Sequence, residues 1–379
     1  MQQTLLPQDA GERCLTPVRS NKAQKIMELK TKEKAIAAMS GGVDSSVAAY
    51  LALQQGYDCI GVTLKLYGGE GNTCCSLNDT EDARSVAFKL GIPFYAFNFQ
   101  LEFDEKIIKK FVRSYECGET PNPCIDCNRF MKFGKLFERA QELDYDYIVT
   151  GHYAKIEKHS DRFLLRKPAD SDKDQTYVLY AMTQEQLAHT LFPLADLQKS
   201  QVREIAESLG FVNAKKPDSQ DICFVPSGDY GSFLEHYSGK TYLPGNFTDK
   251  NGNIIGKHKG ITKYTIGQRK GLGLSSSEPM YVVQKCPETN SIILGASRDL
   301  FRKSLEAEDI NLIAADSIPC PMRVKAKIRY GRGEADATVE QIAEDRIHLK
   351  FDEPQRAITP GQAVVLYDGD YVLGGGTIK

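Results

Sequence analysis

The sequence predicts an α/β protein with a Rossmann-like N-terminal domain built on a parallel sheet, a small mostly-β central domain and a C-terminal β-barrel. In the first half, apolar strand-like runs alternate with helix-like segments, which is typical of a parallel sheet covered on both faces. From about Thr241 onward, short β-type runs are separated by turn signals such as Asn251-Gly252 and Pro360-Gly361. We therefore expect a leader at residues 1–33 and domains at 34–227, 228–303 and 304–379.

The expected elements follow from local patterns. In the first helix-like segment after residue 80, Ala83, Val86, Ala87 and Leu90 fall at i, i+3, i+4 and i+7, and Gly91 follows as a C-terminal cap. The expected elements of the first half are a strand at 34–39, a helix at 47–53, a strand at 59–64, a helix at 83–90, and strands at 93–99 and 147–150. In the last domain we expect strands at 324–330, 347–351 and 363–367.

Composition excludes several classes of protein. The chain has 379 residues, of which 41% are hydrophobic and 26% charged, so it is neither disordered nor collagen-like. No apolar run approaches the ~20 residues that cross a bilayer, and the N-terminus lacks the apolar stretch of a signal peptide. We expect a cytoplasmic protein with no membrane contact. Ten cysteines in such a chain indicate buried thiols, metal or cluster ligands, or catalytic thiols.

A glycine-rich loop lies between the first expected strand and the first expected helix. The run from Ser40 to Ser46 reads Ser-Gly-Gly-Val-Asp-Ser-Ser. Two glycines allow close backbone approach to a phosphate, and the helix N-terminus offers free N–H groups and a positive dipole end. The Gly-Lys-Ser/Thr ending of a Walker A loop is missing.

This run resembles the signature of the PP-loop ATP pyrophosphatase superfamily, which would make residues 34–227 a PP-loop domain. The resemblance implies that ATP is cleaved between its α- and β-phosphates, so that a substrate is adenylated and pyrophosphate is released. It leaves open whether the acceptor is a carboxylate, an amide or a nucleobase carbonyl.

Three cysteines suggest a second site. Cys124 and Cys127 form a Cys-x-x-Cys before a basic helix-like stretch, and Cys223 follows 96 residues after Cys127. Cations and a helix N-terminus lower a thiol pKa, so we expect Cys127 to be thiolate-prone. Structural zinc would need a fourth ligand, and buried inert thiols are a second reading. The third is sulfur chemistry, in which one thiol carries a persulfide and the other resolves it as a disulfide.

An ordered set of motifs makes the resemblance more specific. The set comprises the PP-loop, TPNPCxxCN at 120–128, GHYA at 151–154, KDQTY at 173–177, DSQDICF at 218–224 and YTIGQRKGLG at 264–273. Together these are similar to the bacterial tRNA-specific 2-thiouridylase family, from about residue 34 to the C-terminus.

The resemblance implies site residues for each ligand. The implied ATP-binding residues are Ala38, Met39, Ser40, Gly41, Gly42, Val43, Asp44, Ser45, Leu64 and Gly151. The implied tRNA contacts are Asn122, Pro123, Cys124, His152, Lys173, Asp174, Gln175, Arg329, Tyr330 and Gln362.

The resemblance also implies a mechanism. ATP adenylates O2 of the wobble uridine (U34) of tRNA, Cys223 carries the persulfide and Cys127 is the nucleophile paired with it, ending as a Cys127–Cys223 disulfide. Some family members have Asp where this chain has Cys124. This chain therefore has three thiols, Cys124, Cys127 and Cys223, rather than two at these positions. An alternative is a [4Fe–4S] cluster held by Cys124, Cys127 and Cys223. Mg²⁺ is expected with ATP, and a cysteine desulfurase or sulfur-relay protein is expected as sulfur donor.

Two other functions compete with this interpretation. Another PP-loop ligase acting on a small acid would not need the cysteine pair. A non-catalytic RNA-binding iron–sulfur protein would leave the PP-loop unexplained.

A basic strand offers a surface for RNA. Arg323, Lys325, Lys327 and Arg329 alternate with apolar residues, so that period two places the cations on one face. A second basic run, free of Asp and Glu, spans residues 257–277. Basic stripes of this kind can follow a phosphate backbone.

We predict that the double substitution Lys325→Glu and Lys327→Glu weakens tRNA binding and flattens its salt dependence, because two phosphate contacts are lost. Filter binding of tRNA across a salt series measures both. An unchanged affinity would remove this strand from the tRNA interface.

Overall fold

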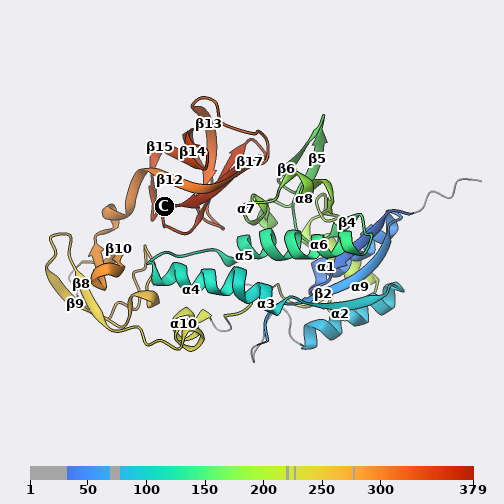
Figure 1. Ribbon diagram of the computed structural model, residues 1–379, viewed down its shortest axis with the longest axis horizontal. Helices are drawn as coiled ribbons and strands as arrows, with labels where there is room; N and C mark the ends of the chain where they lie inside the picture. The colour runs from blue at the N-terminus through green and yellow to red at the C-terminus, as the bar shows by residue number, and fades with distance from the viewer. Residues whose placement is uncertain (1–31, 69–76, 219–221, 226–227, 276–277) are drawn as a thin grey trace, which may run out of the picture. The chain divides into compact units, whose positions relative to one another are not determined.

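In the computed structural model, which describes residues 32–68, 77–218, 222–225, 228–275 and 278–379, the N-terminal domain is built on a five-stranded parallel sheet (Figure 1). Residues 33–379 form one compact unit. The leader expected at 1–33 lies, up to residue 31, outside the described residues. In spatial order the strands are β3 (Phe94–Asn98), β2 (Asp58–Lys65), β1 (Lys34–Ala38), β4 (Tyr147–Val149) and β7 (Thr190–Leu191).

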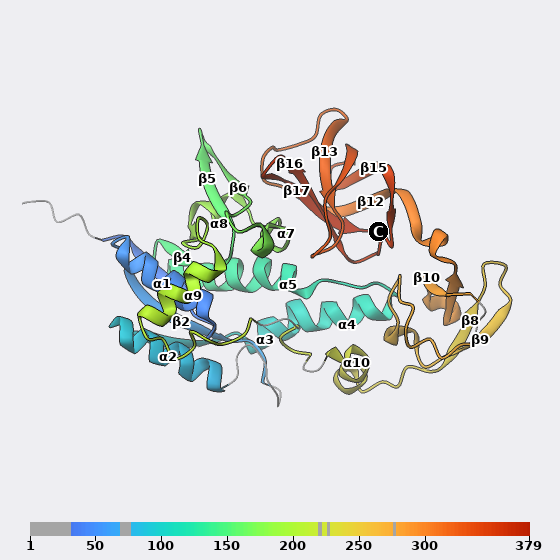
Figure 2. The ribbon, with the colours of Figure 1, turned by 180° about the vertical axis from the view of Figure 1, so that it is seen from behind.

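Helices cover both faces of this sheet, as expected for a Rossmann-like domain. Ala35 and Ala37 of β1 pack in one core and Ile36 packs in another, because successive side chains of a strand point to opposite faces. The first core receives α1 (Val43–Gln54), α2 (Leu77–Leu90) and α9 (Lys199–Ser208). Figure 2 shows α9 beside α1. Burying a side chain such as Ile36 contributes about 1.5–3 kcal/mol.

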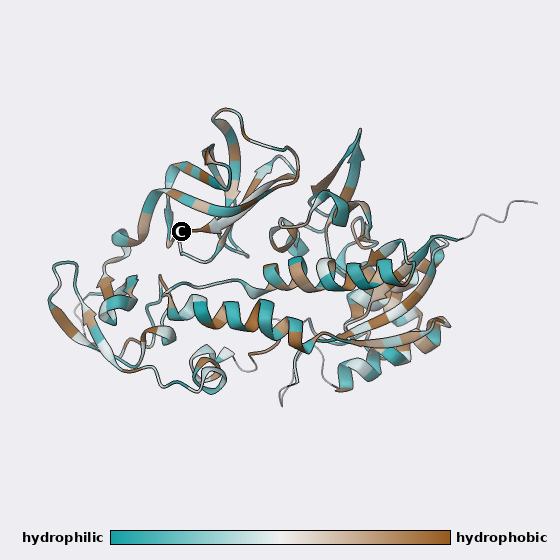
Figure 3. Ribbon diagram, viewed as in Figure 1, coloured by the Kyte–Doolittle hydropathy of each residue, from teal (hydrophilic) through white to brown (hydrophobic). Residues whose placement is uncertain are grey.

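Two long helices cover the other face, and each contains a π-helical stretch with i→i+5 hydrogen bonds. Figure 3 shows the alternating apolar and polar bands along them. The first consists of α3 (Gln100–Phe103), η1 (Asp104–Ile108) and α4 (Lys109–Glu116), and the second of α5 (Pro123–Asp126), η2 (Cys127–Lys135) and α6 (Leu136–Glu142). The remaining elements of this domain are β5 (Lys155–His159), β6 (Arg162–Arg166), η3 (Ser171–Lys173), α7 (Thr176–Leu179) and α8 (Gln184–Ala188).

The central domain is mostly β, as predicted. Its four-stranded sheet has the order β10 (Tyr281–Cys286), β11 (Ser291–Gly295), β8 (Gly245–Thr248) and β9 (Ile254–His258). Its helices are α10 (Tyr230–Ser238), η5 (Ile261–Lys263), η6 (Pro287–Thr289) and η7 (Ser297–Leu300).

The C-terminal domain is an antiparallel barrel, also as predicted. Its strands follow the order β12 (Phe301–Leu312), β15 (Arg346–Arg356), β14 (Ala335–Ala343), β13 (Met322–Lys327), β16 (Ala363–Asp368) and β17 (Tyr371–Ile378). Pairing of β12 with β17 closes the ring, which leaves no free edge between these strands. The β5–β6 hairpin of the N-terminal domain pairs with β17 through Leu165 and Arg166.

Several boundaries differ from the sequence expectation, such as the start of α2 at Leu77 rather than Ala83 and the end of β15 at Arg356 rather than Phe351. Two of these differences have a local cause in the structure. Helix α1 begins at Val43 rather than Val47, because the Ser45 and Ser46 hydroxyls donate to the Gly42 carbonyl at 3.0 Å and hold the first turn. Strand β13 ends at Lys327 rather than Tyr330. The chain turns at Gly331, whose φ is +76°, and Tyr330 is therefore exposed rather than part of the apolar face.

The cysteine segment, residues 120–127, is held at its start by both appended domains. From the barrel, the Thr120 N–H donates to the Pro360 carbonyl at 2.9 Å, and Gln362 Nε2 donates to the Thr120 carbonyl at 2.6 Å. From the central domain, the buried Lys285 ammonium donates to the carbonyls of Glu119 (3.4 Å) and Tyr264 (3.1 Å). These bonds join three domains at one turn of backbone.

We predict that Lys285 makes the free energy of unfolding depend on pH in the alkaline range. Burial lowers its pKa to about 8, so between pH 8 and 10 the unfolded chain binds more protons than the folded one and stability rises with pH. From pH 7.5 to 9.5 the free energy of unfolding should gain on the order of 1–2 kcal/mol. Urea unfolding of wild type and Lys285→Met at both pH values measures this gain, which should be absent from the variant. An equal rise in both proteins would contradict the assignment.

Candidate active site

The glycine-rich loop joins β1 to α1 and is fixed by its own serines. Ser45 Oγ accepts from the Ser40 N–H at 3.2 Å, which closes the loop across the helix N-terminus. Gly41 has φ +77°, and a Cβ there would lie 2.3 Å from the Asp79 carbonyl oxygen. Gly151, directly after β4, is equally close to the backbone of Asp44, where a Cβ would approach within 2.6 Å. Only glycine therefore fits at these two positions.

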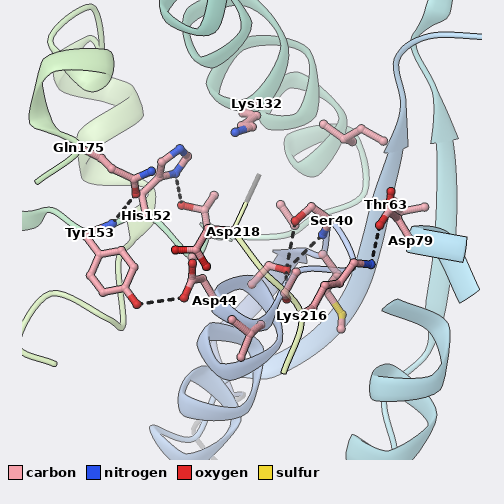
Figure 4. A pocket seen from close by; sticks show the side chains of 18 of the residues that line it. Ser40, Asp44, Thr63, Asp79, Lys132, His152, Tyr153, Gln175, Lys216 and Asp218 are labelled. Atoms are coloured by element: carbon pink, nitrogen blue, oxygen red, sulfur yellow. Dashed lines mark hydrogen bonds and ion pairs between the residues drawn. The ribbon is translucent and has the colours of Figure 1, made fainter. Parts of the chain in front are cut away.

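The loop lines a cavity of about 690 Å³ at the carboxyl ends of β1, β2 and β4 (Figure 4). Ligands of open α/β sheets bind at this edge. Of the residues expected to bind ATP, all line the cavity except Gly41, whose part is the turn itself. Further lining residues are Val62, Thr63, Leu66, Asp79, Lys132, Thr150, His152, Tyr153, Lys173, Gln175, Lys216, Pro217, Asp218 and Tyr330.

Charged side chains beside the loop are already paired with one another. The Lys199 ammonium, at the start of α9, lies 2.7 Å from Asp44 Oδ1 and 2.8 Å from Asp218 Oδ1. Asp44 also accepts a hydrogen bond of 2.9 Å from the Tyr153 hydroxyl. Burial alone would raise the pKa of Asp218, but hydrogen bonds from Lys173 and Lys199 outweigh it and lower that pKa to about 2. The Asp218 carboxylate thus stays ionised throughout the physiological range.

A second pairing lies on the opposite wall. Lys216 Nζ is 2.6 Å from both Asp79 Oδ1 and Asp82 Oδ2, which connects α2 to the segment before Cys223. Sequence analysis singled out none of Lys199, Lys216, Asp79 and Asp218 for the site. Asp218 and Lys216 belong to or border the DSQDICF motif, which was the available signal, whereas no local pattern marked Lys199.

The cysteine segment begins a helix beside the cavity. Asn122 caps this helix by accepting from the Cys124 N–H at 3.1 Å, and Pro123 occupies its first position. Cys124 is exposed but sits in a recess, where burial by surrounding protein raises its pKa and the Lys132 ammonium acts in the opposite direction. Cys124 is consequently a thiol rather than a thiolate at neutral pH.

Cys127 and Cys223 share one packing environment. Both thiols are half-buried, and both pack against the core that lies under the long helices. Phe224, next to Cys223, is fully buried against Phe103 and Phe111. This aromatic contact anchors the Cys223 turn to the same layer as Cys127.

The iron–sulfur alternative does not fit this arrangement. Within the part of the chain that the structure describes, no three His, Cys, Asp or Glu side chains are grouped to hold a metal ion, and Cys124, Cys127 and Cys223 are included in that search. The cluster alternative is therefore unsupported.

The residues expected to contact tRNA divide into two groups. In the first group, Cys124 and Tyr330 are exposed, and Lys173, Gln175 and Tyr330 line the cavity, where Lys173 pairs with Asp218 and Gln175 accepts from the Tyr153 N–H. Tyr330 lies beside the Tyr177 ring, with centroids 6.0 Å apart. Arg329 is half-buried near Thr359, and burial lowers its pKa.

The second group has partners inside the protein. Asn122 caps a helix, Pro123 is buried, and Gln362 is bonded to Thr120. Asp174 accepts from the Thr176 N–H at 2.9 Å and lies 3.5 Å from Lys327. His152 is buried between Phe133 and Phe192, shares a 2.8 Å hydrogen bond with Thr150, and its pKa lies well below the usual value because of burial. As tRNA contacts, these residues stay predictions.

The basic strand is partly neutralised. Arg323 pairs with Asp352 at 2.6 Å and Lys327 with Asp174, while Lys325 is exposed opposite Asp336.

None of the described helices is long and apolar enough to cross a bilayer.

Comparison with known proteins covers nearly the whole chain. Three family models match it: a tRNA methyl transferase HUP domain at residues 33–227, a tRNA methyl transferase PRC-barrel domain at 231–296 and an aminomethyltransferase beta-barrel domain at 302–378. The tRNA-specific 2-thiouridylase MnmA of Clostridioides difficile is 53% identical over 92% of this chain and 98% of its own length. The protein of that name from Symbiobacterium thermophilum is 52% identical, over 92% of each chain.

We predict that Gly151→Ala destabilises the protein by about 1–3 kcal/mol, because the added methyl group meets backbone rather than a movable side chain. Gly333→Ala is the matched control, since nothing lies within 4 Å of a Cβ there. Urea unfolding at pH 7 measures both. Equal midpoints for the two variants would mean that the α1 N-terminus yields to the extra group.

Proposed function

Because the chain belongs to the tRNA-specific 2-thiouridylase MnmA family, we propose that it converts the wobble uridine (U34) of tRNA into 2-thiouridine, with ATP as the activating substrate. Family membership implies ATP binding. The reaction takes place in the cytoplasm, where tRNA and ATP meet.

ATP occupies the cavity lined by Ala38–Ser40, Gly42–Ser45, Leu64 and Gly151. The free N–H groups at the start of α1 face the phosphates, since a helix N-terminus favours negative charge. O2 of the uracil attacks the α-phosphorus, the bond to the β-phosphate oxygen breaks, and pyrophosphate leaves. Mg²⁺, bound through the phosphates, would supply charge neutralisation during this step.

Sulfur then replaces the activated oxygen. The terminal sulfur of a Cys223 persulfide bonds to C2 of the uracil, and the C2–O2 bond breaks with its electron pair leaving on AMP. The Cys127 thiolate attacks the Cys223 sulfur, so the S–S bond to the transferred sulfur breaks and its electrons stay on the new thiocarbonyl. A Cys127–Cys223 disulfide results, and both thiols pack against the same extended core. A dithiol reductant first reduces this disulfide to the two thiols, and a cysteine desulfurase or relay protein then transfers persulfide sulfur to Cys223.

The tRNA approaches at the cavity mouth. Lys173 and Tyr330 line this opening, and Cys124 lies near it, close enough that its thiolate form would raise the pKa of the Tyr330 hydroxyl. An exposed tyrosine suits stacking on an unpaired anticodon base, which must be turned out of its stack to react. Because the Cys124 thiol is protonated at neutral pH, it can donate a hydrogen bond to the base but cannot act there as a base.

One observation supports the proposal most directly: a single helical element, η2, holds Cys127 and also lends Lys132 to the wall of the cavity. The helix that carries the sulfur-transfer cysteine therefore also forms part of the nucleotide cavity.

We expect Cys127→Ala and Cys223→Ala to abolish 2-thiouridine formation, and Cys320→Ala, an exposed thiol in a barrel loop, to leave it unchanged. The anaerobic assay contains unmodified tRNA with U34, ATP, Mg²⁺ and a sulfur source, and measures 2-thiouridine and AMP. Cys124→Ala should retain activity at a reduced rate. Loss of activity in all three site variants together with a visible chromophore would contradict the persulfide route, and wild type without thiouridine would contradict the function.

A further inference from the structure

Lys132 differs from the other lysines at the cavity. Lys173 lies 2.8 Å from Asp218, Lys216 lies 2.6 Å from Asp79, and Lys199 lies 2.7 Å from Asp44. Among the described residues, no carboxylate is paired with Lys132. Figure 4 shows its ammonium at the cavity wall with no ion pair drawn to it. Of these four lysines, Lys132 alone can meet a phosphate without first breaking an ion pair to a described residue.

Its place in the chain is set by π-helical winding. Lys132 comes five residues after Cys127, and both belong to η2. In an α-helix, 3.6 residues per turn would place the two side chains about 140° apart around the axis. The i→i+5 bonding of a π-helix brings them close to one turn apart and hence onto neighbouring sides. The winding thus turns Lys132 toward the side of the helix that carries the cysteine.

Lys132 acts electrically on both parts of the site. Its ammonium opposes the effect of burial on Cys124, and it disfavours the charged form of His152 in the cavity wall. Because a Coulomb interaction weakens with distance, the Lys132 ammonium must lie near both Cys124 and His152. The ammonium therefore lies between the nucleotide cavity and the cysteine segment.

The proposed chemistry needs a cation at this place. In the sulfur-transfer step, an anionic sulfur approaches C2 of a uracil whose O2 carries a negatively charged phosphate. The two negative charges repel each other until AMP has left. A fixed positive charge between them would lower the barrier, since preorganised charge is among the strongest contributors to catalysis.

We propose that Lys132 is a catalytic residue whose ammonium binds the α-phosphate of the adenylated uridine and neutralises it while sulfur attacks C2, a role that rests on the function proposed above. The sulfur electron pair forms the C2–S bond, and the C2–O2 pair leaves with AMP, whose phosphate stays paired with the ammonium. Pyrophosphate release depends on the loop and on its neighbouring lysines instead.

The test compares Lys132→Met and Lys132→Arg with Lys135→Met. Lys135 is the matched control because it lies on the same helix and pairs with Glu138 at 2.6 Å, outside the cavity. Single-turnover reactions use unmodified tRNA with U34, ATP labelled at the α-phosphate, Mg²⁺, and a cysteine desulfurase with cysteine. Adenylated tRNA, 2-thiouridine and the Kd for ATP are measured for each protein.

For Lys132→Met we expect 2-thiouridine formation about 100-fold slower, in line with the loss of one electrostatic group. Adenylated tRNA should accumulate, and the Kd for ATP should change less than threefold. Lys132→Arg should regain at least tenfold, and Lys135→Met should match wild type. If Lys132→Met shifts the unfolding midpoint, Lys132→Gln replaces it.

Two results would overturn the inference. One is a Lys132→Met rate equal to wild type, and the other is a loss of ATP affinity as large as the loss of rate. A failure of the proposed function is seen separately, because wild type itself would then form no adenylated tRNA and no 2-thiouridine.

Discussion

Two hydrogen bonds on Thr120 determine where the cysteines lie. The Thr120 N–H and carbonyl are both bonded to the barrel, through Pro360 and Gln362, and Lys285 of the central domain holds the preceding carbonyl. The helix that carries Cys124 and Cys127 starts three residues later. Any shift of the barrel must therefore move these thiols relative to the phosphate loop, which is fixed to the sheet. The appended domains are therefore part of the scaffold that positions the cysteine segment.

The geometry of the site depends on backbone that departs from regular structure. Gly41 and Gly151 let two segments approach the start of α1 more closely than any side chain would permit. The π-helical winding of η2 then brings a cation and a thiol to neighbouring sides of one helix. Regular sheet and helix build the frame, and these local departures bring the two chemistries together.

Patterns in the sequence predict the frame well and the site in part. The apolar runs of β1 and β2 are buried on both faces, so strand identity and the parallel sheet follow from local hydrophobicity. The sequence predicts the start of α1 four residues too late, because Ser45 and Ser46 have low intrinsic helix propensity. In the structure their hydroxyls donate to the Gly42 carbonyl and hold the first turn. Lys199 was missed because its partner Asp44 is 155 residues away, and no periodicity links them. Gln362 is buried against Thr120, a contact that depends on tertiary structure alone, and its contact with tRNA stays a prediction.

The paired charges around the cavity bear on what the cavity selects. Because Lys173, Lys199 and Lys216 are each matched by a carboxylate, these three lysines exert little net pull on inorganic phosphate or sulfate. A polyanion can form ion pairs with these lysines when a cation that it carries takes over the pairing with Asp44, Asp79 and Asp218. Under the proposed function, this arrangement favours a nucleotide that arrives with its divalent cation over a simple anion. The selectivity for the ligand's charge then depends on ion pairs among residues that do not need to contact the nucleotide base.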